Sequence, residues 1–221
     1  MTRLSEILFV DPFVSDLDII LRNLRVEVEA IVLDASHRPA RQMAAAIEGR
    51  YGLEAVHIIA HGAPGRVRFA AGEWSADTLE EDVQDFAAIG VALSKGGDLR
   101  LWSCCTGAGS VGTAFVDSLA QATGAKIAAA SGLIGAADRG GTWELNARAN
   151  ITAHPPLTEK GVAGYASVLA PNYWQGPGGT AANPTSGNWS TGTNWSSGSS
   201  STGDINTLAG SATYTVRLIR R

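Results

Sequence analysis

This sequence of 221 residues has little charge, few cysteines and no long hydrophobic run. Charged residues make up 17%, below the roughly 25% of an average soluble domain, and the formal net charge is −4. Because there is no basic surplus to attract phosphate backbones, nucleic acid is not an expected partner. No apolar stretch approaches the roughly 18 residues that span a bilayer, and the first one, residues 7–10, stops at Asp11 too soon for a signal peptide. We therefore expect neither a transmembrane segment nor an N-terminal signal peptide.

Cysteine is confined to two adjacent positions, Cys104 and Cys105. A disulfide between chain neighbours closes a strained ring and restrains almost no chain, whereas useful bridges close long loops. This excludes a disulfide framework and leaves a reactive thiol as the feature of interest.

The polar, uncharged residues are concentrated in one part of the chain. No charged residue occurs between residues 161 and 203, and Gly, Ser, Thr and Asn fill 23 of the 34 positions from 170 to 203. Pro155 and Pro156 mark a boundary before this region. We therefore divide the chain into an α/β domain (residues 1–152), a linker (153–170) and a low-complexity tail (171–221).

Before that boundary, short β-branched runs alternate with helix-like stretches, which is the pattern of a parallel sheet covered by helices. The expected fold class is α/β, with a mostly parallel sheet of about six strands and helices on both faces. The expected strands are residues 7–10, 28–33, 56–60, 99–103, 126–130 and 143–145. The expected helices begin at Ser15, Ser36, Ser75 and just before Val111, and those starting at Ser36 and Val111 end near Tyr51 and Gly124.

Chemically useful side chains follow five of these strands. They are Asp11, Asp34, His61, Cys104 and Ser131. Because parallel strands end on one edge of the sheet, where open α/β folds place their sites, we expect these residues to gather there.

The most informative pair is His61 and Cys104. A thiol is a nucleophile only as thiolate, and an imidazole at the end of the neighbouring strand can take its proton and later protonate the leaving group. Gly62 leaves its backbone N–H accessible, so the N–H groups of Gly62 and Cys104 could form an oxyanion hole. The alternative is structural, because a buried cysteine at a strand end is common in cores and His-Gly can simply begin a turn.

Two carboxylates, Asp11 and Asp138, could select a basic side chain before the scissile bond, and Ser131 could line the same pocket. Alternatively, Asp11 ends a strand, Asp138 begins a turn and Ser131 bonds to backbone.

The spacing of His57 and His61, together with the cysteines, could suggest zinc. However, the intervening residues are strand-like and no Glu occupies the zinc-peptidase position, so we expect no metal and no cofactor.

Four motifs in order carry a family resemblance. The sequence resembles an uncharacterised domain near the N-terminus of very large bacterial surface and secreted proteins, which is itself similar to the caspase-like cysteine peptidases. The resemblance implies a caspase-hemoglobinase fold with His61 and Cys104 as its dyad. It departs from the usual family pattern at Ala60 and at Ser103 and Cys105, which would alter the pocket wall. The motifs are Ala-Val-His-Ile-Ile-Ala-His-Gly-Ala-Pro-Gly (55–65), Leu-Trp-Ser-Cys (101–104), Ala-Ala-Ser (129–131) and Gly-Gly-Thr-Trp-Glu-Leu (140–145).

The tail contains Gly-Asn-Trp-Ser at 187–190 and Thr-Asn-Trp-Ser at 193–196, followed by a strand-like alternation at 212–218. It resembles the start of the β-solenoid of autotransporter-type passengers, of which about three repeats are needed for stability. A flexible linker is the alternative.

These observations predict a cysteine endopeptidase domain of a bacterial surface or secreted protein. Its substrate would be a polypeptide, and its own downstream region is one candidate. The alternative is a catalytically silent module for display, retention or adhesion with the same fold.

Overall fold

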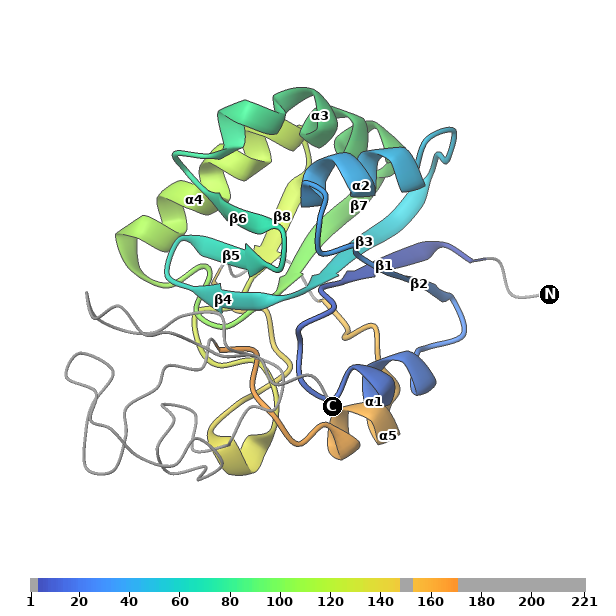
Figure 1. Ribbon diagram of the computed structural model, residues 1–221, viewed down its shortest axis with the longest axis vertical. Helices are drawn as coiled ribbons and strands as arrows, with labels where there is room; N and C mark the ends of the chain where they lie inside the picture. Colours follow the sequence, from blue (N-terminus) through green and yellow to red (C-terminus); the bar gives the residue numbers. More distant parts are fainter. Residues whose placement is uncertain (1–3, 148–152, 171–221) are drawn as a thin grey trace. The chain divides into compact units, whose positions relative to one another are not determined.

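A five-stranded, wholly parallel sheet forms the centre of the computed structural model, which describes residues 4–147 and 153–170 (Figure 1). These residues belong to one compact unit, residues 1–170. The strand order is β2-β1-β3-β7-β8. The strands are β1 (Glu6–Val10), β2 (Val28–Val32), β3 (Leu53–Ile59), β7 (Leu93–Trp102) and β8 (Lys126–Ala129).

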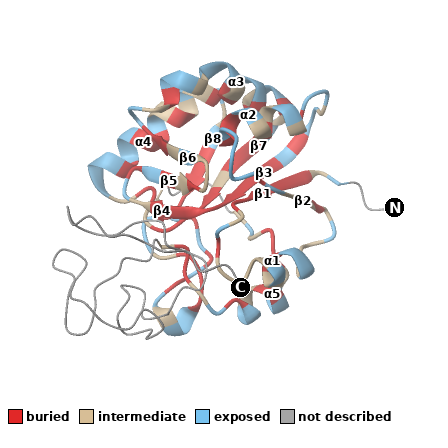
Figure 2. Cartoon of the chain, in the orientation of Figure 1, coloured by how far each residue is buried: buried red, intermediate tan, exposed pale blue. Residues whose placement is uncertain are grey.

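The central strands are buried on both faces, as expected of parallel strands covered by helices (Figure 2). The predicted α/β class and parallel sheet are therefore confirmed. The sixth predicted strand, residues 143–145, is wrong, since Thr142 makes only an isolated bridge to Ile134. Trp143 and Leu145 alternate because both bury apolar side chains in a loop, without forming a ladder.

Helices α2, α3 and α4 cover one face of the sheet, and α1 and α5 cover the other (Figure 1). Helix α4 ends as predicted, with Gly124 in the left-handed region at φ 67°. Three predicted helix starts, at Ser15, Ser36 and Ser75, are wrong, because Asp16 precedes α1, Arg38 precedes α2 and Ser75 closes a strand. Helix α2 also stops well before Tyr51. The helices are α1 (Leu17–Arg22), α2 (Pro39–Ala46), α3 (Val83–Ala92), α4 (Gly109–Thr123) and α5 (Glu159–Gly164).

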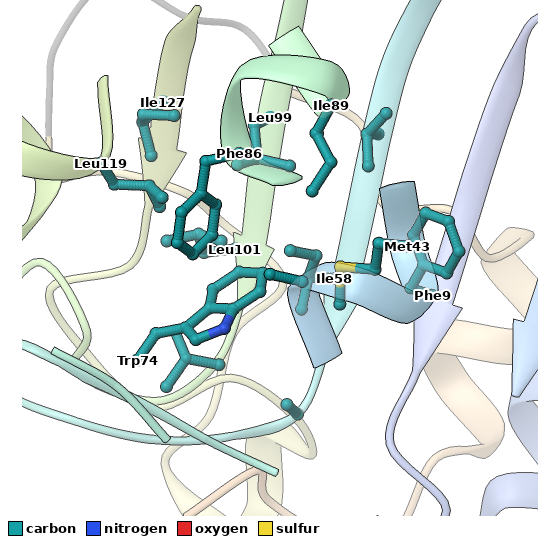
Figure 3. Close-up of a cluster of buried hydrophobic side chains, with 14 of the residues drawn as sticks. Phe9, Met43, Ile58, Trp74, Phe86, Ile89, Leu99, Leu101, Leu119 and Ile127 are labelled. Atoms are coloured by element: carbon teal, nitrogen blue, oxygen red, sulfur yellow. The ribbon is translucent and has the colours of Figure 1, made fainter. Parts of the chain in front are cut away.

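A large apolar core fills the space between the sheet and the α2–α4 face (Figure 3). Trp74 packs against Phe69 and Phe86, with ring centroids 4.8 and 4.9 Å away. A second apolar cluster lies against the opposite face of the sheet and includes Trp102, Cys104 and Tyr165. Apolar clusters therefore cover both faces of the sheet, and only the carboxyl ends of its strands, where open α/β folds place their sites, remain to be considered.

A small antiparallel sheet follows β3, and the sequence patterns did not predict it. It consists of β4 (His61–Ala63), β5 (Arg66–Phe69) and β6 (Gly72–Ser75). Its strands are only three or four residues long, and β5 alternates Arg66 and Arg68 with buried Val67 and Phe69, so they lack the apolar runs that marked the central strands. Consequently His61 does not end β3, which stops at Ile59, but is the first residue of this second sheet.

Residues 153–170, expected to be a linker, are part of the folded unit. They contain α5, whose first turn is capped by the Thr158 side chain, and they bury Leu157, Tyr165 and Leu169. The prolines that suggested a boundary instead accept hydrogen bonds, since the carbonyls of Pro155 and Pro156 are both bonded to Arg25. The predicted tail and its solenoid repeat lie outside the described residues.

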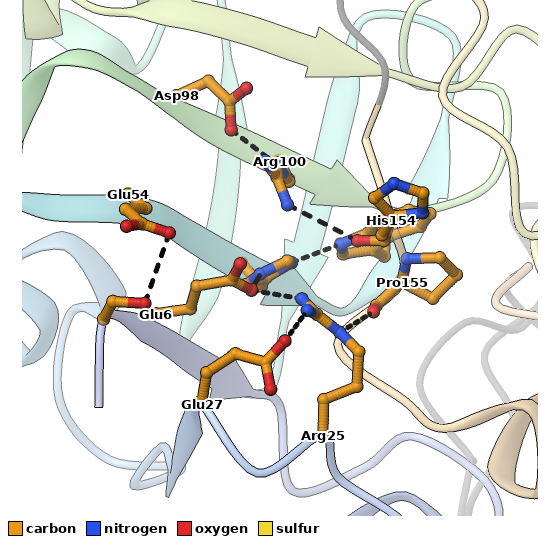
Figure 4. A network of polar contacts seen from close by, with 11 residues as sticks. Glu6, Arg25, Glu27, Glu54, Asp98, Arg100, His154 and Pro155 are labelled. Carbon is orange, nitrogen blue, oxygen red and sulfur yellow. Dashed lines mark hydrogen bonds and ion pairs between the residues drawn. The ribbon is translucent and has the colours of Figure 1, made fainter. Parts of the chain in front are cut away.

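A buried polar network ties β1, β3 and β7 to this C-terminal segment (Figure 4). The Trp102 indole N–H donates to His57 Nδ1 at 2.9 Å, which leaves His57 Nε2 to donate to Glu6 at 2.7 Å. Arg25 pairs with both Glu6 and Glu27. Burial lowers the pKa of His57, so the imidazole is neutral at pH 7. Across the described residues, no helix is long and apolar enough to cross a membrane.

Candidate functional site

His61 and Cys104 lie at the same edge of the sheet. Strands β3 and β7 pair in parallel up to Ile59 and Trp102, and His61 and Cys104 each follow two residues after this last pair. The backbones also meet directly, because a Cβ on Gly62 would lie 2.6 Å from the Cys104 carbonyl oxygen. The sheet therefore brings together the two residues on which the predicted chemistry depends.

The His61 imidazole is nearly buried, and its Nε2 lies 3.4 Å from the carbonyl oxygen of Phe13. Phe13 lies in the loop after β1, beside the point where the strand order reverses between β1 and β3. A carbonyl can only accept, so this contact assigns the proton to Nε2 and makes Nδ1 the basic nitrogen.

Asp11 supports this loop rather than opening into a pocket. Its Oδ1 accepts from the Phe13 N–H at 2.9 Å and its Oδ2 from the Ala70 N–H at 2.6 Å. The carboxylate thereby links the loop after β1 to the small antiparallel sheet. The contacts give Asp11 an indirect part, which is to hold the carbonyl that orients His61.

The Cys104 side chain is 1% exposed and sits beside Ile134. Its Sγ accepts from the Ile134 N–H at 3.2 Å and lies 3.5 Å from the Ile134 carbonyl oxygen. Burial raises the pKa of the Cys104 thiol to about 12, so the sulfur is protonated at neutral pH. Cys105 is partly exposed and has a left-handed backbone at φ 58°.

The two N–H groups predicted as an oxyanion hole share one acceptor. Gly62 N–H and Cys104 N–H both donate to the carbonyl oxygen of Leu169, at 3.0 and 3.4 Å. Leu169 lies in the segment that the sequence patterns marked as linker, and its side chain is fully buried. The only sequence signal for it was a short apolar run just before the low-complexity tail, and such a run does not indicate where in the fold it binds.

The remaining predicted pocket residues lie in three different settings. Ser103 is fully buried and pairs with Thr106, hydroxyl to hydroxyl, at 2.6 Å. Ser131 is exposed, and its hydroxyl donates to Asn146 at 2.8 Å. Asp138 is exposed in the short 3₁₀ helix η2 (Ala137–Arg139). Of the predicted set, therefore, only Gly62 and Cys104 converge on a single acceptor atom.

Metal ligands do not gather at this edge. His57 spends both ring nitrogens on Trp102 and Glu6, so it does not combine with His61 and the cysteines. Within residues 4–147 and 153–170, no group of three or more His, Cys, Asp or Glu side chains could hold a metal ion. The chemistry available from these residues is that of a thiol, an imidazole and backbone donors.

Comparison with known proteins is consistent with a single family over the folded unit. Neither a curated protein nor a solved structure matches the chain. One family model matches residues 7–169, a span that begins in β1 and ends at Leu169. Residues 153–169 of the predicted linker therefore lie within the span of the family model. The chain belongs to the family described as Domain of unknown function (DUF4347).

Proposed function

We propose that this domain is a caspase-like cysteine endopeptidase in which Cys104 is the nucleophile and His61 the general base and acid. The observation that carries the proposal is the convergence of Gly62 N–H and Cys104 N–H on one carbonyl oxygen, that of Leu169. Two backbone donors fixed on a peptide carbonyl can stabilise the charge that develops there when a nucleophile attacks. Removing one such donor typically costs a factor of about 100 to 1,000 in turnover.

The position of His61 supports the same assignment. With Nε2 held by the Phe13 carbonyl oxygen at 3.4 Å, Nδ1 is the nitrogen able to take the thiol proton. It would return that proton to the amine of the departing peptide. The close approach of Gly62 to Cys104, with a Cβ on Gly62 lying 2.6 Å from the Cys104 carbonyl oxygen, keeps His61 near the Cys104 backbone.

The raised pKa of Cys104 defines the state of the site. A thiol with a pKa of about 12 is about one part in 10⁵ thiolate at pH 7, so free thiolate does not carry the reaction. The proton must pass to His61 as the sulfur attacks, or the thiol must first be uncovered. The first route predicts a slow enzyme, and the second predicts an enzyme that is silent until the residues covering the sulfur move away.

The second candidate is a catalytically silent module for display or adhesion in a surface or secreted protein. The burial of Cys104 favours it, because a sulfur that is 1% exposed fits a packing role as well as a guarded nucleophile. The two candidates differ in whether the reactivity of Cys104 depends on His61.

The test is labelling of the full chain with peptidyl acyloxymethyl ketones that carry an acidic, a basic or an apolar residue next to the ketone. In this reaction the thiolate forms a thioether and a carboxylate leaves. We expect at least one probe to label Cys104, with labelling lost in Cys104→Ala, kept in Cys105→Ala and slowed about 100-fold in His61→Ala. Equal labelling of both thiols, labelling independent of His61, or none with any probe would instead support the silent module.

A further inference from the structure

Residues 167–169 of the chain lie at the candidate site in the manner of a bound peptide. The Leu169 N–H donates to the Ile134 carbonyl oxygen and the Ala136 N–H donates to the Ser167 carbonyl oxygen, both at 2.9 Å. Between these two bonds, Gly135 and Val168 form an antiparallel bridge. Addition of an extended segment to a backbone edge is a general way of recognising peptides.

Leu169 is held on both sides of its carbonyl carbon. Its N–H is fixed by Ile134 and its carbonyl oxygen by Gly62 and Cys104. The Cys104 sulfur contacts the same Ile134, through the N–H at 3.2 Å and the carbonyl oxygen at 3.5 Å. The thiol, the two donors and one peptide carbonyl are therefore gathered around a single residue.

The backbone facing this segment leaves room for it. Gly135 has φ +134°, and a Cβ there would lie 2.2 Å from the Ser167 carbonyl oxygen and 2.8 Å from the Val168 Cα. Only glycine allows so close an approach in that conformation. The backbone of residues 134–136, in the loop after β8, thus forms the binding site for residues 167–169, which we call the seat.

The side chain of Leu169 defines the chemistry of the seat. It is fully buried within the second apolar cluster, together with Ile134 and Trp102. Ala170, which follows, is partly exposed. The seat therefore takes an apolar residue, in place of the basic residue that Asp11 and Asp138 were predicted to select.

We infer that the chain is its own substrate, and that the bond cut is the peptide bond between Leu169 and Ala170. This inference rests on the proposed function. It names the substrate of that site as a peptide in cis with leucine before the scissile bond. The product would be the folded unit ending at Leu169 and a released segment beginning at Ala170.

The chemistry balances with water as the only added reactant. The Cys104 thiol gives its proton to His61, and the sulfur bonds to the Leu169 carbonyl carbon while Gly62 and Cys104 N–H hold the oxyanion. The bond from that carbon to the Ala170 nitrogen breaks, and His61 returns the proton to the new amine. Water then attacks the thioester, which leaves a Leu169 carboxylate and restores the thiol.

The experiment follows the full chain and its Cys104→Ala, His61→Ala and Cys105→Ala variants over a day at pH 7 to 9, by intact mass and N-terminal sequencing. We expect a fragment that begins at Ala170 in the wild type and in Cys105→Ala, and an intact chain in the other two. A matched pair tests the seat: Leu169→Met should retain cleavage within about tenfold, whereas Leu169→Lys should slow it at least about 100-fold, because an ammonium would enter an apolar cluster.

The outcomes separate the two proposals. A wild-type chain that stays intact while the ketone probes label Cys104 in a His61-dependent way overturns self-cleavage and leaves the peptidase proposal standing. Cys104-dependent cleavage at another bond does the same. An intact chain with no His61-dependent labelling overturns both.

Discussion

Substitution of Gly135 by alanine should uncover the Cys104 thiol. A Cβ at this position would collide with the Ser167 carbonyl oxygen at 2.2 Å, and the φ of +134° is one that alanine rarely adopts. Both effects push residues 167–169 away from the backbone at 134–136. The site should then be open for a larger fraction of the time.

The magnitude follows from the contacts that hold this segment. Four main-chain hydrogen bonds involve residues 167–169, from Gly62, Cys104, Ala136 and Leu169. At about 0.5–1.5 kcal/mol each, these bonds are largely offset by the chain entropy of about 1–2 kcal/mol lost per ordered residue, so a modest strain decides the balance. Alanine held at a φ of +134° costs about 1–3 kcal/mol. A cost of about 2 kcal/mol against the closed state is roughly a 30-fold change in the closed-to-open ratio. Exposure to water also removes the burial that raises the pKa of Cys104 from its ordinary 9.0 to about 12. A rise of at least about 30-fold in the alkylation rate is therefore the lower bound.

The assay is iodoacetamide alkylation at pH 8, followed by mass spectrometry in a His61→Ala/Cys105→Ala background that has one thiol and no general base. Gly132→Ala is the matched control, because a Cβ there meets nothing within 4 Å. We expect rapid alkylation with Gly135→Ala and slow alkylation with Gly132→Ala. Equal rates would refute the argument that residues 167–169 cover the sulfur.

Three further predictions concern stability. Trp102→Phe should lower the free energy of unfolding, measured in urea, by about 2–4 kcal/mol, because it removes the indole N–H that donates to His57 and leaves a cavity. An unchanged urea midpoint would contradict the buried network. The lowered pKa of His57 means that the unfolded chain binds a proton more readily, so the free energy of unfolding should fall as pH drops below 6.5. Burial alone would raise the pKa of Glu6, but its bond to His57 and the nearby positive charges lower it, so a further loss of stability is expected below about pH 4.5. A free energy of unfolding that stays constant from about pH 7 to about pH 5 would refute the His57 assignment, and one that falls no further from about pH 5 to about pH 2 would refute the Glu6 assignment. Gly90→Ala should lower the melting temperature by more than about 10 °C, because its Cβ would lie 1.7 Å from a carbonyl oxygen of α4. Gly96→Ala is the control and should change the melting temperature by about a degree, because a Cβ there meets nothing within 4 Å. Similar shifts for the two variants would contradict the packing of α3 on α4.

Local patterns were sufficient to predict the central sheet. The runs at β1, β3 and β8 are short and mostly apolar, and turn residues separate them from the neighbouring segments, so composition alone predicts that they are strands. The parallel arrangement followed from the alternation with helices. From these two features came the expectation that His61 and Cys104 would meet, and the Gly62 backbone does approach that of Cys104, since a Cβ on Gly62 would lie 2.6 Å from the Cys104 carbonyl oxygen.

Local patterns failed where a segment owes its structure to distant partners. The strands β4, β5 and β6 are too short and too polar to be recognised, and they form because Trp74 packs beneath α3 and Asp11 holds the Ala70 N–H. Residues 143–145 alternate like a strand but find no neighbouring strand with which to pair. In both cases a tertiary contact overrode the local preference.

The identity of the thiol, the imidazole and the glycine beside it was determined by the sequence alone, because strand ends and residue types are local properties. The position of Leu169 was decided only by the tertiary structure. Its carbonyl reaches Gly62 and Cys104 across more than sixty residues of intervening chain, through backbone hydrogen bonds that no side-chain pattern encodes. Backbone groups are the same at every residue, and so only the folded chain could reveal which carbonyl fills the site.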